Sequence, residues 1–198
     1  LAVYTGPGYG ALASVGCNDD RIPAAFPSVV TSEVSFNAVA DVTYQIAVEG
    51  VGDGFIAEQG NITLSLVTTP ANDQFATGTP MSGQFSEASG YNIRATRQSG
   101  EPDHGFAGGQ QSVWWTWTAP ASGNASITTW GSSYDTALGV YTGNAVSALT
   151  TVANNDDEAF PVVRTSKATF AAVAGTTYHF AVDGYLYTDN FGFPAGTD

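Results

Sequence analysis

The chain has 198 residues, of which 18 are acidic and 5 are Lys or Arg, giving a net charge of −13 at pH 7. Hydrophobic residues make up 43% of the chain and aromatic residues 12%, enough to build a core, which excludes a wholly disordered protein. The acidic balance argues against a nucleic-acid partner, because phosphates are bound by Lys and Arg, and no apolar run is long enough for membrane insertion.

The chain opens with a segment that is repeated near its end. Residues 1–20 align without gaps on residues 138–157, with 11 of 20 positions identical. Residues 32–50 then align on residues 166–184, with 10 of 19 positions identical. Because order, spacing and hydrophobic phase are preserved together, the sequence predicts two copies of one structural repeat.

The repeat sets the expected domain boundaries. Residues 1–67 are the C-terminal half of a first repeat, and residues 68–73 (TTPAND) are a linker in which Pro, Asn and Asp break the preceding strand. Residues 74–198 are a second repeat, which is expected to lack its last strand because the counterpart of 60–67 (GNITLSLV) falls at the end of the chain. We expect strand edges left open in this way to pair with neighbouring sequence or molecules.

The second repeat is a series of short segments with period-2 alternation. A helical turn is expected only within 72–81, where Asn72 or Asp73 can cap it. The strand-like segments, rich in β-branched and aromatic residues and bounded by turn residues, lie at 112–120, 124–130, 137–143, 167–173 and 177–184. This pattern predicts an all-β fold of tandem antiparallel β-sandwiches of jelly-roll type, the first of them incomplete.

Several motifs of the second repeat occur together in a fixed order. They are GEPDHGFAGGQQSVWWTWTAPASG (100–123), GSSYDTALGVYTG (131–143), NNDD (154–157) and TTYHFAVDG (176–184). In this combination the chain resembles the bacterial pre-peptidase C-terminal domains and their relatives in large secreted and surface proteins. The resemblance implies an accessory β-sandwich outside the cell, without fixing a ligand or an activity.

One cysteine departs from the pattern of that family. Relatives often carry Cys near the positions of Trp130 and of the NDD turn, whereas the second repeat here has Trp130 and Asn154, and only the first repeat retains Cys17. The resemblance implies that a disulfide partner of Cys17 would lie outside this chain. The alternative is that Cys17 is a small half-buried hydrophobic residue.

Two equivalent acidic turns are candidate calcium sites. Asn155, Asp156 and Asp157 form one turn, and Asp135, from a neighbouring loop, begins the predicted strand that leads to it. The matching turn of the first repeat contributes three residues, which are Asn18, Asp19 and Asp20. Ca²⁺ prefers six to eight oxygen ligands from carboxylates, amides and carbonyls, which such turns supply. The alternative is that these side chains only stabilise turns through bonds to the backbone, and no other cofactor is expected.

No catalytic constellation emerges from the sequence. The segment Glu101-Pro102-Asp103-His104 combines two carboxylates with an imidazole, but it has no second His nearby, and we interpret it as a loop whose Glu and His brace neighbouring strands. His179 is replaced by Gln45 in the first repeat, which indicates an exposed polar position. Neither a nucleophile elbow nor a zinc or phosphate-binding motif is present, so we expect that the protein is not an enzyme.

Aromatic residues are the candidate contact surface. Within 113–117, alternation places Trp115 on the core face and leaves Trp114 half-exposed or covered by a neighbour. Four further aromatic residues stand in the tail segment YLYTDNFGF, too many to bury locally, and they are Tyr185, Tyr187, Phe191 and Phe193. The alternative use of the aromatic residues is a sugar-stacking platform, whose candidate members are Trp114, Trp115, Trp117, Trp130, Tyr134 and Tyr141.

These observations favour a secreted, non-enzymatic repeat module. We expect it to assemble with copies of itself, or with adjacent repeats of a longer chain, into an extracellular filament, sheath or surface fibre. Strand complementation and aromatic contacts would join the units. The alternative is an accessory module of a larger secreted hydrolase that binds a polysaccharide or another substrate.

Overall fold

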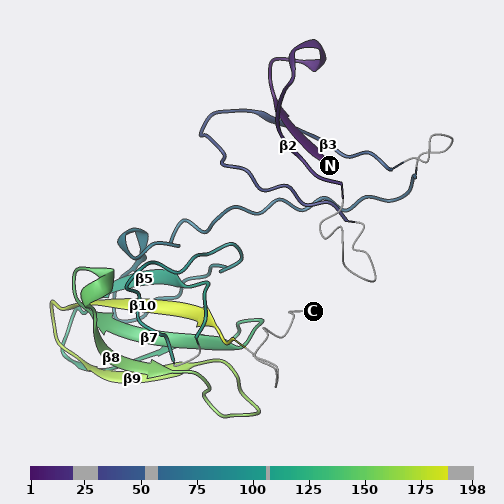
Figure 1. Cartoon of the computed structure of the whole chain (residues 1–198). Helices are drawn as coiled ribbons and strands as arrows, with labels where there is room; N and C mark the ends of the chain where they lie inside the picture. The colour runs from purple at the N-terminus through teal and green to yellow at the C-terminus, as the bar shows by residue number, and fades with distance from the viewer. Residues whose placement is uncertain (20–30, 52–57, 106–107, 187–198) are drawn as a thin grey trace. The chain divides into compact units, whose positions relative to one another are not determined.

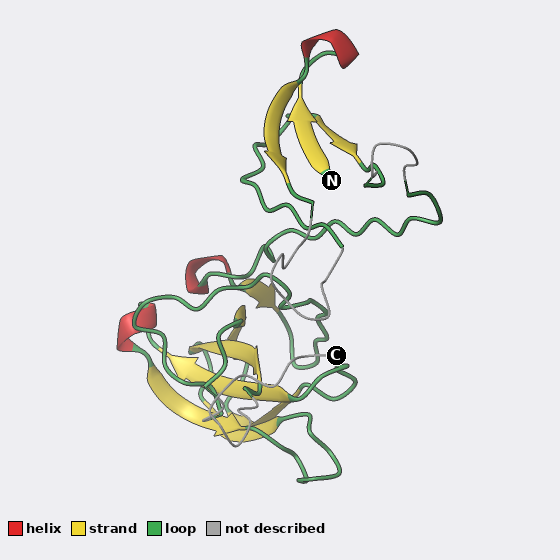
Figure 2. Ribbon diagram, turned by 45° about the vertical axis from the view of Figure 1, so that its right-hand side comes forward, coloured by secondary structure: helices red, strands yellow, loops and turns green. Residues whose placement is uncertain are grey.

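The computed structural model describes residues 1–19, 31–51, 58–105 and 108–186. It divides into two units, Leu1–Leu64 and Ser65–Asp198, which we call unit 1 and unit 2. Both are built from β-strands, and the helical segments of the described residues are single 3-10 turns (Figure 2). The all-β fold expected from the period-2 segments is confirmed.

Unit 2 is built around a five-stranded sheet in the order β4-β5-β10-β7-β8. In Figure 1, β10 lies between β5 and β7, and β8 follows β7. Its strands are β4 (Thr79–Met81), β5 (Val113–Thr118), β7 (Thr136–Thr142), β8 (Thr150–Asn155) and β10 (Thr177–Gly184). All neighbours are antiparallel except β4 and β5, which are parallel, so the expectation of a purely antiparallel sandwich misses this one pair.

A two-stranded sheet covers one face of this five-stranded sheet. It consists of β6 (Gly123–Thr128) paired antiparallel with β9 (Lys167–Ala172). Strand β9 alternates strictly between exposed and buried residues, and its buried side chains join those of the large sheet. The core between the layers is formed by Ala119, Leu138, Val140, Ala168, Phe170, Ala172, Tyr178 and Phe180. Two packed layers of this kind agree with a β-sandwich.

The opposite face of the large sheet is covered by irregular chain. The 3-10 turn η2 (Phe75–Thr77) lies there, at the position where the sequence predicts a helical turn. Its N-cap is Gln74, without a side-chain hydrogen bond, so the expectation that Asn72 or Asp73 caps it is wrong. Asn72 instead clamps β5, because its backbone carbonyl accepts from Trp114 N–H at 2.8 Å and its Nδ2 donates to the Trp114 carbonyl at 2.9 Å.

Unit 1 contains three strands in the order β2-β1-β3. They are β1 (Ala2–Thr5), β2 (Ala13–Cys17) and β3 (Tyr44–Ala47), and the 3-10 turn η1 (Tyr9–Ala11) connects β1 to β2. In the aligned repeat these strands correspond to β7, β8 and the middle of β10, and η1 corresponds to η3 (Val146–Ala148). Unit 1 therefore has the same strand order as one side of the unit 2 sheet.

The pairing register is also the same in the two units. Val3 pairs with Gly16 as Val140 pairs with Ala153, and in both units the register shifts immediately after that valine. Individual contacts recur as well: the Phe36 and Tyr44 rings are 4.9 Å apart, and their counterparts Phe170 and Tyr178 are 4.8 Å apart. Local sequence therefore builds the same half-sheet twice.

Unit 1 differs from unit 2 where strand partners are missing. The counterpart of β9, residues 33–38, is not a strand among the described residues of unit 1. The segment 60–67 (GNITLSLV), which the sequence predicts to be a strand, has no strand structure either, and it exposes Ile62, Leu64 and Leu66. Strands need a hydrogen-bonding neighbour, and the described part of unit 1 offers none to these segments. The counterpart of 60–67 in unit 2 lies outside the described residues.

Candidate functional site

The acidic corner of unit 2, formed by Asp135, Asp156 and Asp157, is brought together by strand pairing. Asp135 directly precedes β7, and Asp156 and Asp157 directly follow β8. Because β7 and β8 are antiparallel neighbours, with Leu138 opposite Asn155, the start of one strand meets the end of the other. The sequence expectation that Asp135 approaches the NDD turn agrees with this geometry.

Burial, with repulsion between neighbouring carboxylates at Asp156 and Asp157, raises the pKa values of these carboxyl groups. Burial, followed by the charges of Asp157 and Asp135, raises the pKa of Asp156 to about 6. Burial also raises the pKa of Asp135 and of Asp157, and Arg164 opposes the rise in both. Arg164 Nη1 donates to Asp135 Oδ2 at 3.0 Å. The corner thus holds more negative charge than one Arg compensates, which either a proton or a cation would relieve.

Several ligands predicted for calcium have other roles in the structure. Asn155 Oδ1 accepts from Lys167 N–H at 2.8 Å, and its counterpart Asn18 Oδ1 accepts from Glu33 N–H at 3.3 Å. Both Asn side chains therefore hold the turn to the following segment. Asp19 is exposed, its backbone carbonyl accepting from the Ser32 hydroxyl, and Asp20 lies outside the described residues. Among the described residues, no group of three His, Cys, Asp or Glu side chains is placed to hold a metal ion.

The orphan oxygens of the corner belong to its two turn aspartates. Oδ1 of Asp156 and Oδ1 of Asp157 are buried and have no hydrogen-bond partner among the described residues. Buried carboxylate oxygens normally accept hydrogen bonds or coordinate cations. A calcium ion at this corner would therefore use these two carboxylates together with backbone carbonyls and water, rather than the Asn amides.

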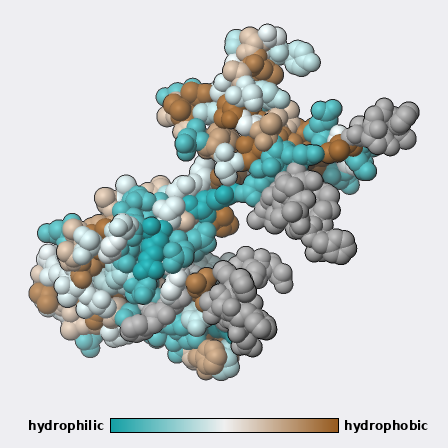
Figure 3. Space-filling model, viewed as in Figure 1, coloured by the Kyte–Doolittle hydropathy of each residue, from teal (hydrophilic) through white to brown (hydrophobic). Residues whose placement is uncertain are grey.

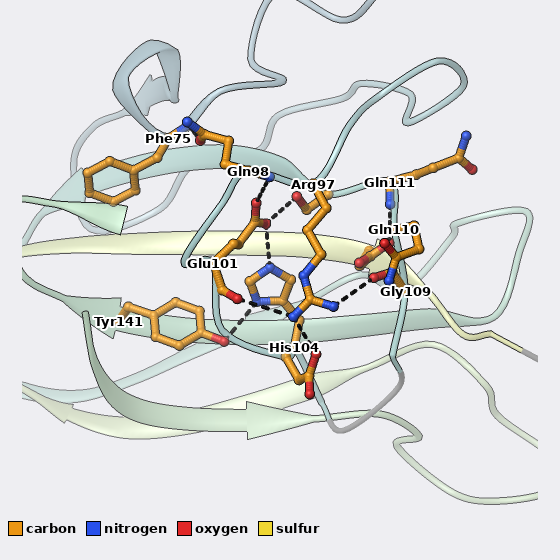
Figure 4. Close-up of polar contacts among 12 residues, drawn as sticks. Phe75, Arg97, Gln98, Glu101, His104, Gly109, Gln110, Gln111 and Tyr141 are labelled. Carbon is orange, nitrogen blue, oxygen red and sulfur yellow. Dashed lines mark hydrogen bonds and ion pairs between the residues drawn. The ribbon is translucent and has the colours of Figure 1, made fainter. Parts of the chain in front are cut away.

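A second polar cluster, buried under the large sheet, is formed by Glu101, His104, Ser112 and Tyr141. Figure 4 shows His104 between the Glu101 carboxylate and the Tyr141 hydroxyl. Nε2 of His104 lies 2.8 Å from Glu101 Oε1, and Nδ1 lies 2.8 Å from the Tyr141 hydroxyl oxygen. The Ser112 hydroxyl donates to Glu101 Oε1, and Gln98 N–H donates to Oε2 at 2.7 Å.

The protonation pattern of this cluster follows from its surroundings. Burial raises the pKa of Glu101, but hydrogen bonds from His104, Ser112 and the Gln98 backbone together bring it below the ordinary value. Burial and the charge of Glu101 raise the pKa of Tyr141, which keeps its phenol protonated. The ionised Glu101 thus accepts from His104 Nε2–H, and His104 Nδ1 shares a hydrogen bond with the Tyr141 hydroxyl.

The cluster has the residue types of an acid–base site but not the access of one. The side chains of Glu101 and His104 are 0% and 2% exposed, and Tyr141 is 1% exposed, so substrate atoms do not reach them. Ser112 donates to Glu101 and not to His104, so the three do not form a nucleophile–base–acid relay. What the arrangement does is tie the loop 97–112 to β7, in agreement with the bracing role expected from the sequence.

Trp114 corrects the expectation of an exposed contact residue. It is 0% exposed, and its ring meets Phe75 and His104 edge-on, each at 5.3 Å between ring centroids. The alternation of β5 is as predicted, but η2 and the loop 97–105 cover the face that the sequence leaves open. Tyr185 is 40% exposed, as a contact residue should be, whereas Tyr187, Phe191 and Phe193 lie outside the described residues.

Trp130 is the exposed tryptophan of unit 2. It is 79% exposed beside a shallow cleft of about 420 Å³, lined also by Thr128, Val163, Glu158 and Lys167. Lys167 Nζ donates to Glu158 Oε1 at 3.4 Å within that lining. The sequence places Trp130 among many aromatic residues and does not single it out. The available signal is its position just after β6 and before Gly131, in a turn where the core is no longer within reach.

Comparison with known proteins identifies no relative: no protein family, curated protein or solved structure matches this chain. Within its described residues, no helix has the length and apolar character needed to cross a membrane. Cys17 is exposed and is not in a disulfide. A disulfide to a partner outside the chain remains a prediction.

Proposed function

We propose that this chain is a non-enzymatic structural module of a secreted bacterial protein. Copies of it, or adjacent repeats of a longer chain, assemble into an extracellular filament, sheath or surface fibre through β-strand and aromatic contacts. One observation carries the proposal: unit 1 reproduces half of the unit 2 sheet in the same register, and its described residues contain no counterpart of the strands that complete the sheet in unit 2.

The exposed apolar surface of unit 1 supports assembly. Figure 3 shows hydrophobic side chains on the visible surface of this unit. Val3 is buried, but Ile46 is 37% exposed, whereas its counterpart Phe180 in unit 2 is 4% exposed. Open strand edges and exposed apolar side chains favour pairing with another chain. The motifs that resemble pre-peptidase C-terminal domains support a secreted bacterial host.

A structural role also fits the chemistry of the buried cluster. The imidazole and carboxylate best suited to acid–base chemistry, His104 and Glu101, are enclosed and hold a loop to the sheet. An enzyme needs such groups within reach of substrate.

Calcium at the acidic corner is part of the proposal. Repulsion among Asp135, Asp156 and Asp157 favours a bound cation, and the two buried orphan oxygens are available to it. A cation here would stiffen the junction of β7 and β8. Removal of the cation by EDTA should then lower the melting temperature of the protein. An unchanged melting temperature would show that the acidic side chains only stabilise their turns and bind no calcium.

The size of the protein in solution tests assembly directly. Sedimentation velocity over a range of concentrations should show species heavier than the 20.5 kDa chain, increasing with concentration. A well-folded monomer of 20.5 kDa at every concentration would refute the proposal.

A second candidate function is supported by the cleft beside Trp130. An exposed indole bordered by Thr128, Glu158 and Lys167 can stack on the apolar face of a sugar ring while the neighbours bond its hydroxyls. This favours an accessory polysaccharide-binding module of a larger hydrolase. Pull-down on insoluble polysaccharides tests it with Trp130→Ala, since Trp114 is buried and cannot serve. Absence of binding to any polymer would remove this candidate.

A further inference from the structure

The outer edge of β3 is the edge that does not pair with β1, and its counterpart in unit 2 shows what kind of strand fits there. In unit 2, β10 has two neighbours, β7 on one side and β5 on the other. In unit 1, the counterpart β3 pairs with β1, and no strand of the described residues pairs with its other edge (Figure 1). The edge corresponds, residue for residue, to the edge of β10 that holds β5.

One face of this edge has the composition of a tryptophan pocket. In unit 2, Trp114 of β5 clusters with two buried residues, Tyr141 and Ala181, and with three partly buried ones, Phe75, Val146 and Leu149, of which all but Phe75 lie in the repeated segment. The aligned residues of unit 1, which we call the tryptophan seat, are Tyr4, Ala47, Tyr9 and Leu12. All four can pack on an indole, yet Tyr9 is 98% exposed, Ala47 is exposed and the other two are only half-buried. The four residues of the tryptophan seat are therefore present, but no tryptophan packs on them in the described part of unit 1.

The other face of β3 also carries large apolar side chains whose counterparts are buried in unit 2. Tyr44 and Ile46 occupy the places of Tyr178 and Phe180, which in unit 2 are 3% and 4% exposed. In unit 2, Trp115 and Trp117 of β5 pack against the cluster that contains these two residues. An occupant of the β3 edge must therefore present large apolar side chains to both faces at once. A β-strand with tryptophan on alternate faces meets this requirement.

We propose that the outer edge of β3 binds, in antiparallel orientation, a strand of the Val113–Thr118 type (VWWTWT) supplied by another copy of the repeat in which this strand is not held by its own β10; in unit 2 itself, β5 is already paired with β4 and β10. This inference rests on the proposed assembly and names the strand that performs it. The pairing of β10 with β5 transfers directly: the residue equivalent to Trp114 lies opposite Ala47, and the residue equivalent to Trp115 lies opposite Ile46. The strand itself carries no charged side chain, so its contact with the β3 edge buries no unpaired charge.

A labelled peptide in trans tests the inference on the full chain. The probe is a synthetic peptide of residues 110–121 (QQSVWWTWTAPA), followed by fluorescence anisotropy as the 198-residue protein is added. Saturable binding is expected. Ala47→Arg places a charge in the tryptophan seat at an exposed position and should weaken binding at least tenfold. Ala13→Arg makes the same exchange at an exposed position of β2, on the opposite edge of the sheet, and should leave binding unchanged.

A second peptide checks the register. Replacing the residue equivalent to Trp114 with Ser should weaken binding at least tenfold, because this indole fills the seat. Equal binding to wild type and Ala47→Arg, or an equal loss in Ala13→Arg, would overturn the inference. A chain that self-associates in sedimentation but ignores the peptide would overturn this strand assignment and leave the assembly intact. A monomeric chain that binds the peptide would refute the assembly and keep the edge site.

Discussion

His104→Ala probes the buried cluster that holds the loop 97–112 to the large sheet. The change removes two hydrogen bonds of 2.8 Å, one to the Glu101 carboxylate and one shared with the Tyr141 hydroxyl. Breaking a buried pair by removing one partner costs about 3–5 kcal/mol, because the other charge stays buried. Ser112 and the Gln98 N–H still donate to Glu101, so we expect the lower end, about 3 kcal/mol, out of a total stability of about 5–15 kcal/mol.

The pH dependence of this loss has a definite sign. The pKa of Glu101 in the folded protein lies below its ordinary value of 4.5, so its ionised form contributes stability above that value. This contribution disappears as the pH falls through the folded pKa. The difference between wild type and His104→Ala should therefore be largest near pH 7 and should shrink in acid.

Urea unfolding at 25 °C, followed by tryptophan fluorescence and far-UV circular dichroism, measures both effects. Tyr141→Phe is the milder companion variant, with an expected loss of about 1–2 kcal/mol from one hydrogen bond. Tyr4→Phe is the matched control, because Tyr4 occupies the aligned position in unit 1 and should change stability by less than about 0.5 kcal/mol. A loss below about 1 kcal/mol in His104→Ala, or an equal loss at pH 3 and pH 7, would refute the bracing role.

Three further predictions concern single positions. Gly139→Ala should destabilise unit 2 by about 1–3 kcal/mol in urea unfolding, because the added Cβ would lie 2.3 Å from the oxygen of the buried, hydrogen-bonded Tyr141; a neutral result would contradict the packing. Asp156→Asn should increase the free energy of unfolding by about 1 kcal/mol or less at pH 7.5, seen as a higher melting temperature, and should have no such effect at pH 4. The folded pKa of about 6 lies above the ordinary 3.8, so the ionised form costs stability as the pH rises through that range. Calcium should then stabilise wild type more than Asp156→Asn, and an equal response would argue against a site there. Cys17 should react completely with a thiol reagent without denaturant, and a protected thiol would show that it is buried in an assembly.

The fold class could be predicted from the sequence because it depends on local patterns. Alternation in segments such as 112–120 and 167–173 reflects the two faces of a strand, and β5 and β9 form there. The repeat alignment predicts structure for the same reason, because aligned residues such as Val3 and Val140 occupy the same position in the strand pairing of the two units. The parallel pairing of β4 with β5 has no such local signal, because a three-residue edge strand carries little pattern.

The burial of Trp114 is what the sequence alone could not predict. Alternation shows that Trp114 and Trp115 point to opposite faces, but it does not show which face is covered more completely. That depends on the loop 97–105 and η2, which lie across the sheet and carry no regular pattern of their own. For the same reason the exposed Trp130 could not be distinguished from the other three tryptophans, which are buried or partly buried.

The sequence alone predicts an all-β chain with one half-sheet built twice, because strand alternation and the repeat are local patterns that add up along the chain. Which of the resulting surfaces are covered depends on the tertiary structure. In unit 2 the loop 97–105 and η2 supply partners from elsewhere in the sequence, so that Glu101, His104 and Trp114 become buried. In unit 1 the same local sequence leaves Tyr9 and Ala47 exposed. Burial of these residues requires a packing partner from a segment that is distant in the sequence, and local pattern does not supply one.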